Sequence, residues 1–136
     1  MRQQDFTGRQ VVITGGAGDI GLACAKLFLD VGATVHLIDI DEGRLHQCVK
    51  RLDAGDRLTI AVSNLSNLSV CAEALMAERR APFALVHLAG IFEEDHLDGT
   101  QGEVWQRAIS SNLSSAYDMA IAFHRLRDRR QQARIV

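Results

Sequence analysis

The stretch VVITGGAGDIG, residues 11–21, decides the fold of this chain. Its first four residues are apolar or β-branched, which is typical of a buried parallel strand. Helix-type periodicity then runs from Ile20 to Val31, and we expect Gly32 to cap that helix. Gly15, Gly16, Gly18 and Gly21, at the junction of strand and helix, predict a loop whose backbone another molecule can approach closely.

The same alternation of strand and helix continues along the chain. Apolar segments predict further strands, at 33–40, 58–62 and 83–90, and a fifth opens at ARIV, 133–136. Helical periodicity occurs at 42–52, 68–80 and about 103–130. The last of these helices is expected to bury one continuous face, made of Val104, Ala108, Ile109, Leu113, Ala116, Ala120, Phe123 and Leu126.

This alternation predicts an α/β fold. We expect a Rossmann-type, doubly wound parallel sheet in three α/β/α layers, joined by right-handed crossovers. No internal boundary divides the chain, so residues 1–136 are predicted to form a single domain that stops at its fifth strand.

The loop also matches a nucleotide-binding spacing. Gly16, Gly18 and Gly21 fit Gly-x-Gly-x-x-Gly, and Asp39 ends the next predicted strand. Such glycines bring a pyrophosphate to a helix N-terminus, while the carboxylate accepts ribose hydroxyls. An ordinary tight turn followed by a strand-end acid would show the same residues. We favour the dinucleotide site because its whole strand–loop–helix context is present.

Asp39 and Asp19 both bear on the cofactor. Asp39 would repel the additional phosphate of NADP, so NAD is expected, although Arg44 leaves NADP open. A carboxylate at Asp19 about 5 Å from a phosphate would cost on the order of 3 kcal/mol at an effective dielectric near 20. We therefore expect Asp19 to turn away and cap the helix.

Composition narrows the function classes. Hydrophobic residues make up 47% of the chain and the net charge is −2, as in a globular protein without a polyanion-binding surface. The arginine-rich stretch 125–134 is interpreted as a solvated helix face, and the acidic stretch 92–98 as solvated surface. Three spaced cysteines and five histidines without ligand spacing predict reduced thiols, no metal site and a cytoplasmic location. No segment resembles a membrane span.

Four segments together resemble the short-chain dehydrogenase/reductase family. FTGRQVVITGGAGDIG, 6–21, is similar to its first strand and its Thr-Gly-x-x-x-Gly-x-Gly loop, with Asp19 in place of the middle glycine. VSNLSN, 62–67, resembles the Asp-Val step that contacts adenine. LVHLAGIF, 85–92, resembles the Asn-Asn-Ala-Gly turn, and EVWQRAISSNL, 103–113, the segment that leads to an active-site asparagine.

The resemblance implies roles for individual residues. Asn112 would be the catalytic asparagine of a proton relay. The cofactor-binding residues would be Gly15, Gly16, Gly18, Asp19, Ile20, Gly21, Asp39, Asn64, Leu65, Ala89 and Gly90. His87 and Leu88 stand where the family has asparagines, and we interpret His87 as a core histidine with satisfied hydrogen bonds rather than a catalytic one.

The resemblance also implies an activity. Family members transfer hydride between nicotinamide and a secondary alcohol or ketone, but their catalytic Ser and Tyr-x-x-x-Lys have no counterpart here. Tyr117 is followed four residues later by Ile121. We therefore expect the cofactor-binding half of an NAD-dependent oxidoreductase, with strand order 3-2-1-4, which is inactive alone and forms homo-oligomers through the helix at 103–130. The alternative is a non-catalytic module that binds a nucleotide or pairs with a partner.

Overall fold

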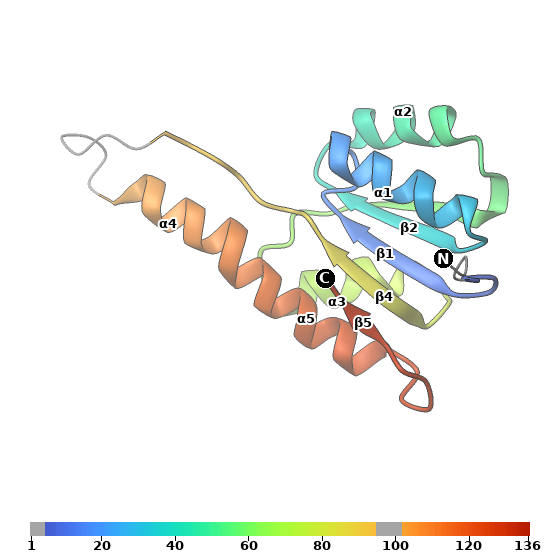
Figure 1. Ribbon diagram of the computed structural model, residues 1–136. Helices are drawn as coiled ribbons and strands as arrows, with labels where there is room; N and C mark the ends of the chain where they lie inside the picture. The colour runs from blue at the N-terminus through green and yellow to red at the C-terminus, as the bar shows by residue number, and fades with distance from the viewer. Residues whose placement is uncertain (1–4, 95–101) are drawn as a thin grey trace.

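The computed structural model describes residues 5–94 and 102–136 (Figure 1). Residues 95–98 of the acidic stretch therefore lie outside the described ranges. The strands are β1 (Gln10–Thr14), β2 (Thr34–Asp39), β3 (Leu58–Val62), β4 (Pro82–His87) and β5 (Arg134–Ile135). They form one parallel sheet in the order β3-β2-β1-β4-β5, which confirms the doubly wound arrangement.

The helices alternate with the strands as predicted. They are α1 (Asp19–Asp30), α2 (Glu42–Leu52), the short 3₁₀ helix η1 (Gly55–Arg57), α3 (Leu68–Met76), α4 (Glu103–Ile109), the π-helical η2 (Ser110–Ser114) and α5 (Ser115–Leu126). The C-cap of α1 is Val31 rather than Gly32; Gly32 follows it with φ +90°, a conformation that favours glycine.

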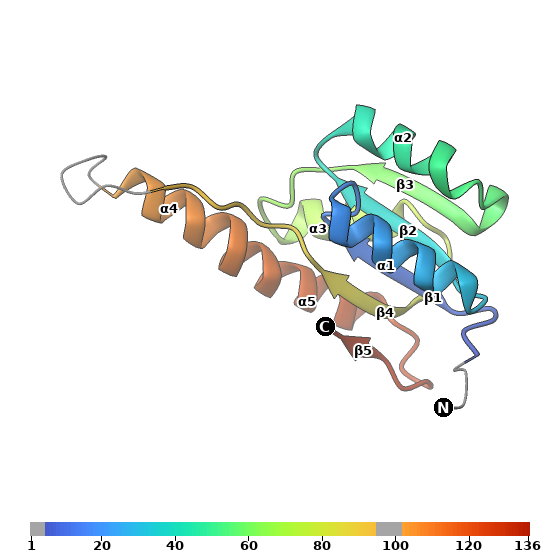
Figure 2. The same ribbon diagram turned by 45° about the horizontal axis from the view of Figure 1, so that its top comes forward.

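Two apolar cores hold the layers together. Helices α1 and α2 cover one face of the sheet, whereas α3 and α5 cover the other (Figures 1 and 2). Ala25 and Leu45 belong to the first core, and Cys71 and Phe123 belong to the second. Every residue of β1 is buried, because helices cover both faces of this central strand.

The C-terminal helical segment differs from its prediction. It ends at Leu126 rather than Arg130, and a π-helical turn divides it into α4 and α5. The expected continuous buried face is interrupted, since the Leu113 side chain is 62% exposed. Helix α4 extends past the carboxyl edge of the sheet, so only α5 packs fully against it (Figure 1).

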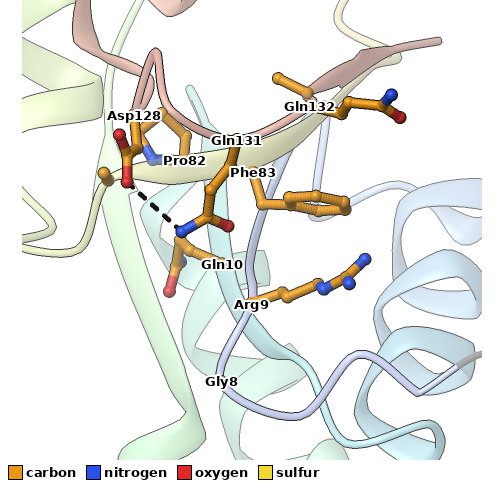
Figure 3. Close-up of a pocket in the computed structure, with 10 residues that line it drawn as sticks. Gly8, Arg9, Gln10, Pro82, Phe83, Asp128, Gln131 and Gln132 are labelled. Carbon is orange, nitrogen blue, oxygen red and sulfur yellow. Dashed lines mark hydrogen bonds between the residues drawn. The ribbon is translucent and has the colours of Figure 1, made fainter.

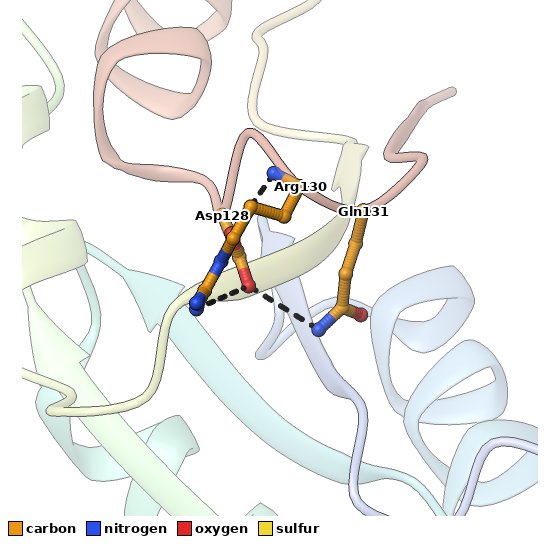
Figure 4. Close-up of polar contacts among 3 residues, drawn as sticks. All are labelled: Asp128, Arg130 and Gln131. Atoms are coloured by element: carbon orange, nitrogen blue, oxygen red, sulfur yellow. Dashed lines mark hydrogen bonds and ion pairs between the residues drawn. The ribbon is translucent and has the colours of Figure 1, made fainter.

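The arginine-rich stretch is a turn, not a helix face. Asp128 accepts hydrogen bonds from the backbone N–H and the guanidinium of Arg130, and from the Gln131 amide at 3.3 Å (Figure 4). The hydrogen bond from the Arg130 side chain holds the pKa of Asp128 below its usual value. These contacts fold the chain back from α5 into β5, so the interpretation of a solvated helix face was wrong.

A small cavity lies at the amino edge of the sheet, near the starts of β1 and β4 (Figure 3). It measures about 90 Å³, and the Arg9 guanidinium lies 4.3 Å from the Phe83 ring centroid beside it. This is the opposite edge from the glycine-rich loop. No helix in the described part of the chain is long and apolar enough to cross a membrane.

Candidate functional site

The glycine-rich loop lies where the strand order reverses. From β1 the chain proceeds to β2 on one side, while β4 lies on the other side of β1. Open α/β sheets bind their ligands at such a reversal of strand order, beyond the carboxyl ends of the strands. Gly15 enters the loop with φ +63°, and a Cβ on it would lie 2.8 Å from the Leu88 carbonyl carbon. The turn after β4 therefore packs directly on Gly15.

Other loop glycines are also required by the protein's own packing. A Cβ on Gly16 would lie 2.9 Å from the Leu37 Cβ, and one on Gly21 would overlap the Gly15 carbonyl oxygen. Gly18 is different, because its φ is −76° and a Cβ there would lie 3.3 Å from the Gly15 oxygen. Loop packing, rather than ligand approach alone, thus accounts for Gly15, Gly16 and Gly21.

The first turn of α1 presents backbone donors. Gly18 is the N-cap and supplies no side-chain cap, while the Leu22 N–H bonds the Gly18 carbonyl at 2.9 Å. The N–H groups of Asp19, Ile20 and Gly21 have no hydrogen-bond partner among the described residues. Unpaired donors and the positive end of the helix dipole together favour an anion such as phosphate.

The capping prediction for Asp19 was wrong. Asp19 is the first residue of the helix, one position beyond the cap, so its side chain cannot bond the N–H groups that follow in the way an N-cap does. It lies exposed in the first helical turn. Its carboxylate adds negative charge close to the backbone donors, and any bound phosphate has to tolerate that charge.

Asp39 holds the glycine loop from the neighbouring strand. Its Oδ2 accepts the Ala17 N–H at 3.0 Å, and its Oδ1 accepts the Asp41 N–H at 3.1 Å. A carboxylate has about four acceptor sites, so both oxygens keep lone pairs for further donors. The spacing of residues in the sequence gave no signal for this contact between Asp39 and Ala17.

The two residues expected near adenine differ in burial. Asn64 is exposed beyond the end of β3, whereas the Leu65 side chain is buried in the core beneath α3 and α5. Two residues missed by the sequence reasoning lie exposed at neighbouring strand ends, namely Ile40 after β2 and Val62 in β3. An apolar residue directly at a strand end beside a candidate site is the signal that would have found them.

Asn112 lies in the π-helical turn and reaches the turn after β4. Its Oδ1 accepts the Ile91 N–H at 2.9 Å, and its Nδ2 donates to the Ile91 carbonyl at 2.9 Å. A Cβ on Gly90 would overlap the Asn112 Oδ1, so a side chain there would have to displace the Asn112 amide. Ala89 donates its N–H to the Thr14 Oγ1 at 3.2 Å, so this turn joins β1 to Asn112.

His87, at the end of β4, connects β1 to α5 through its ring. Its Nδ1 lies 2.9 Å from the Thr14 Oγ1, and its Nε2 lies 3.4 Å from the Ser115 Oγ. Both ring nitrogens have partners, as expected, but His87 is only half-buried and lies at the margin of the core. Burial lowers the pKa of His87 below its usual value, which keeps the ring neutral near pH 7.

The described residues give little support to a metal site or a nucleophilic thiol. Within residues 5–94 and 102–136, no cluster of three or more His, Cys, Asp or Glu side chains could hold a metal ion. Burial, with a smaller contribution from Asp118, raises the pKa of the Cys71 thiol to about 11, so it is a poor nucleophile. The described groups suit binding of a phosphate-bearing ligand.

Comparison with known proteins identifies the family of this chain. The family model described as short chain dehydrogenase matches residues 9–136. The chain belongs to this family of oxidoreductases. The match includes the glycine loop, Asp39 and Asn112.

Individual relatives cover a similar part of the chain. The chain is 32% identical over 116 residues to a 3-oxoacyl-(acyl-carrier-protein) reductase of Chlamydia pneumoniae, covering 82% of this chain and 47% of that protein. It is 33% identical over 111 residues to cyclopentanol dehydrogenase of Comamonas testosteroni, covering 79% and 44%. The apo structure of a short chain oxidoreductase from Pseudomonas aeruginosa, described as containing an atypical catalytic center, superposes with a TM-score of 0.87 at 28% identity, covering 97% and 53%. The chain thus spans about half the length of these relatives.

Proposed function

We propose that this chain is the cofactor-binding part of an NAD-dependent oxidoreductase. The observation that carries the proposal is the juxtaposition at the end of β1. Three N–H groups that open α1 have no hydrogen-bond partner in the part of the chain that the structure describes, and the Asp39 carboxylate accepts the Ala17 N–H of the same loop. A dinucleotide needs both features, one for its pyrophosphate and one for its ribose hydroxyls.

Each candidate site residue then has a role in cofactor binding. Gly18 and the N–H groups from Asp19 to Gly21 receive the pyrophosphate. Asp39 accepts the adenosine ribose hydroxyls with its remaining lone pairs, and the exposed Ile40 and Val62 border the adenine together with Asn64. The turn at Ala89 and Gly90 meets the second ribose. Asn112 stands beside that turn as the relay amide.

The choice of NAD over NADP rests on charge. NADP carries a phosphate on the ribose hydroxyl that Asp39 would accept, and two anions within hydrogen-bond distance repel each other. Arg44, the cation nearest in sequence, lies in α2, where its backbone N–H bonds Asp41. Relief of that repulsion would require its side chain to reach back across the loop.

The whole protein's reaction is part of the proposal. When bound, the nicotinamide accepts or supplies the hydride exchanged with a secondary alcohol or ketone. The described chain positions the cofactor and holds Asn112, but it offers no Tyr-x-x-x-Lys pair: Tyr117 is exposed on α5 and Ile121 follows it. The chain alone is expected to bind cofactor without turnover.

Calorimetric titration of the chain with NAD and with NADP tests this function. We expect saturable 1:1 binding of NAD and at least about tenfold weaker binding of NADP, since a displaced charge-assisted hydrogen bond is worth about 1.5–3 kcal/mol. Absence of binding by either dinucleotide would refute the proposal. Equal affinities would refute the NAD preference alone.

A pairing surface is the second part of the proposal. Trp105, Leu113 and Tyr117 are exposed apolar or aromatic side chains along the α4–α5 segment. Apolar surface of this kind marks association sites, and we infer a homo-oligomer through this segment. A cytoplasmic location is supported by Cys48 and Cys71, which are buried in separate cores on opposite faces of the sheet and cannot pair.

A further inference from the structure

A chain of side-chain hydrogen bonds crosses the molecule beneath the candidate site. It runs from Thr14 at the end of β1, through His87 at the end of β4, to Ser115 at the start of α5. Ser115 continues the chain by donating to the Ser111 carbonyl at 2.6 Å. The two strands and the helix that it joins adjoin the glycine loop, the turn at Ala89 and the π-helical turn that carries Asn112.

The number of protons available on Thr14 fixes the direction of these hydrogen bonds. The Thr14 hydroxyl accepts two backbone N–H groups, one from Ala89 at 3.2 Å and one from Leu88 at 3.1 Å. The Leu88 N–H is shared with the Thr14 carbonyl at 3.2 Å. The lone pairs of the hydroxyl are then used, so its one proton must go to the His87 Nδ1 at 2.9 Å. The Nδ1 of His87 is therefore an acceptor, and a neutral ring carries its proton on Nε2, facing Ser115.

The π-helical turn completes the other end. In an α-helix the Ser115 N–H would bond the Ser111 carbonyl, but here it bonds Ser110, one residue earlier. The freed Ser111 carbonyl takes the Ser115 hydroxyl instead, which leaves the Ser115 oxygen able to accept from His87. Ser111 precedes Asn112, so His87 reaches the relay amide through two links.

The surroundings of His87 contain few charges. Thr14 faces it from β1 and Ser115 from α5, and from the β5 side the Val136 carbonyl accepts the His87 backbone N–H at 2.8 Å. Burial alone lowers the pKa of His87, and no charged side chain among the described residues shifts this pKa. Protonation of this ring would thus change the hydrogen bonds rather than an ion pair.

We propose that His87 is a pH-sensitive positioning residue, which in its neutral form locks the glycine loop to the helix that carries Asn112 and releases them when protonated. Its effect on cofactor affinity rests on the proposed function; the lock itself does not.

The physical reason is a conflict at Thr14. A protonated ring places an N–H donor on Nδ1, directly opposite the Thr14 hydroxyl, which then loses its acceptor. The Thr14 hydroxyl oxygen can accept the new donor only by releasing the N–H of Leu88, which keeps its bond to the Thr14 carbonyl, or that of Ala89. Release of Ala89 loosens the turn that packs on Gly15.

Nitrogen NMR of the cofactor-free chain tests the lock directly. We expect the Nε2–H tautomer for His87 near neutral pH, a titration below 6.5, and shifts of the Leu88 and Ala89 amides with the same midpoint. An Nδ1–H tautomer, a titration at or above 6.5, or silent amides would overturn the proposal. The wild-type chain suffices, so no variant has to fold.

Calorimetry with NAD between about pH 7.5 and pH 5 tests the effect on the site. We expect wild-type affinity to fall about three- to tenfold across this range, as for one lost hydrogen bond. His87→Asn supplies a non-titrating acceptor to Thr14 and should bind like wild type at pH 7.5 without the fall. His87→Leu leaves the Thr14 hydroxyl unpaired and should bind weakly at both pH values. His46→Asn, on the exposed face of α2, should keep the wild-type pH profile.

The outcomes separate the two proposals. If NAD binds equally at both pH values, or if His87→Asn retains the fall, the positioning role is refuted while the cofactor function stands. If NAD does not bind at all but the NMR midpoints coincide, the cofactor function is refuted while the lock stands.

Discussion

Asp39 and Ala17 are joined by a hydrogen bond of 3.0 Å from the loop N–H to the carboxylate Oδ2. The residue that we propose for ribose binding is therefore also a brace of the loop that would bind pyrophosphate. Loss of the carboxylate should act on both functions, whereas loss of its charge alone should act mainly on the choice of cofactor.

This distinction gives a paired prediction. Asp39→Asn keeps an acceptor for Ala17 but removes the charge, so we expect NAD affinity to fall less than about tenfold while NADP affinity rises. Asp39→Ala removes both and should weaken NAD further. Calorimetric titration of each variant with both dinucleotides measures the ratio. Glu42→Gln, which removes an exposed acid in α2, is the control; an equal change in its ratio would mean that general charge, not Asp39, sets the preference.

Gly15 and Gly18 offer a matched test of loop packing. Gly15→Ala places a Cβ at φ +63° and 2.8 Å from the Leu88 carbonyl carbon, so we expect it to lower the free energy of unfolding by more than about 2 kcal/mol. Gly18→Ala meets an allowed φ of −76° and should cost less than about 1 kcal/mol. Urea denaturation measures both. Similar losses for the two variants would contradict the packing described for this loop.

The sequence predicted the fold but not several details of the site. The apolar, β-branched runs at 11–14 and 58–62 identified strands, of which the central β1 is fully buried and the edge strand β3 only partly. The position of Asp19 was mispredicted by one residue, since the cap is set by where the backbone enters the helix, at Gly18 with φ −76° and ψ 166°. The π-helical turn at Asn112 was missed because neither the turn nor the tertiary hydrogen bonds from Asn112 to Ile91 leave a periodic signal in the sequence.

Asp19 should oppose cofactor binding rather than support folding. Its exposed carboxylate makes no cap hydrogen bond, yet it lies in the first turn, where the proposed pyrophosphate binds. We expect Asp19→Asn to tighten NAD binding by up to about tenfold at low salt, with a smaller gain at high salt because ions screen the repulsion. The loss of a favourable dipole interaction should cost about 0.3–1 kcal/mol of stability. Weaker binding by Asp19→Asn would show that the carboxylate contacts the cofactor favourably.

His36 should make folding stability depend on pH. Its ring is fully buried in β2, between the Thr59 hydroxyl at 2.7 Å and the Ala74 carbonyl at 3.0 Å, and burial lowers its pKa below 6.5. The unfolded chain therefore binds more protons than the folded chain as the pH falls below 6.5, and stability decreases in that range. Above 6.5 this contribution is fully present.

Urea denaturation at several pH values measures this slope. Because His87 also has a lowered pKa, His36→Asn should flatten the slope only in part. A wild-type stability that stays constant or rises as the pH falls below 6.5 would contradict a lowered pKa of His36 in the folded chain.

The exposed apolar side chains of the α4–α5 segment should determine oligomeric state. Leu113 and Tyr117 are four residues apart and are 62% and 67% exposed, so a partner could bury them together. We expect Leu113→Glu and Tyr117→Glu each to shift the chain toward monomer in sedimentation velocity, because a charge is costly to bury unpaired. Leu27→Glu is the matched control: Leu27 is equally exposed at 67%, but it lies on α1, on the opposite side of the sheet. Dissociation by Leu27→Glu instead would place the pairing surface on the α1 side.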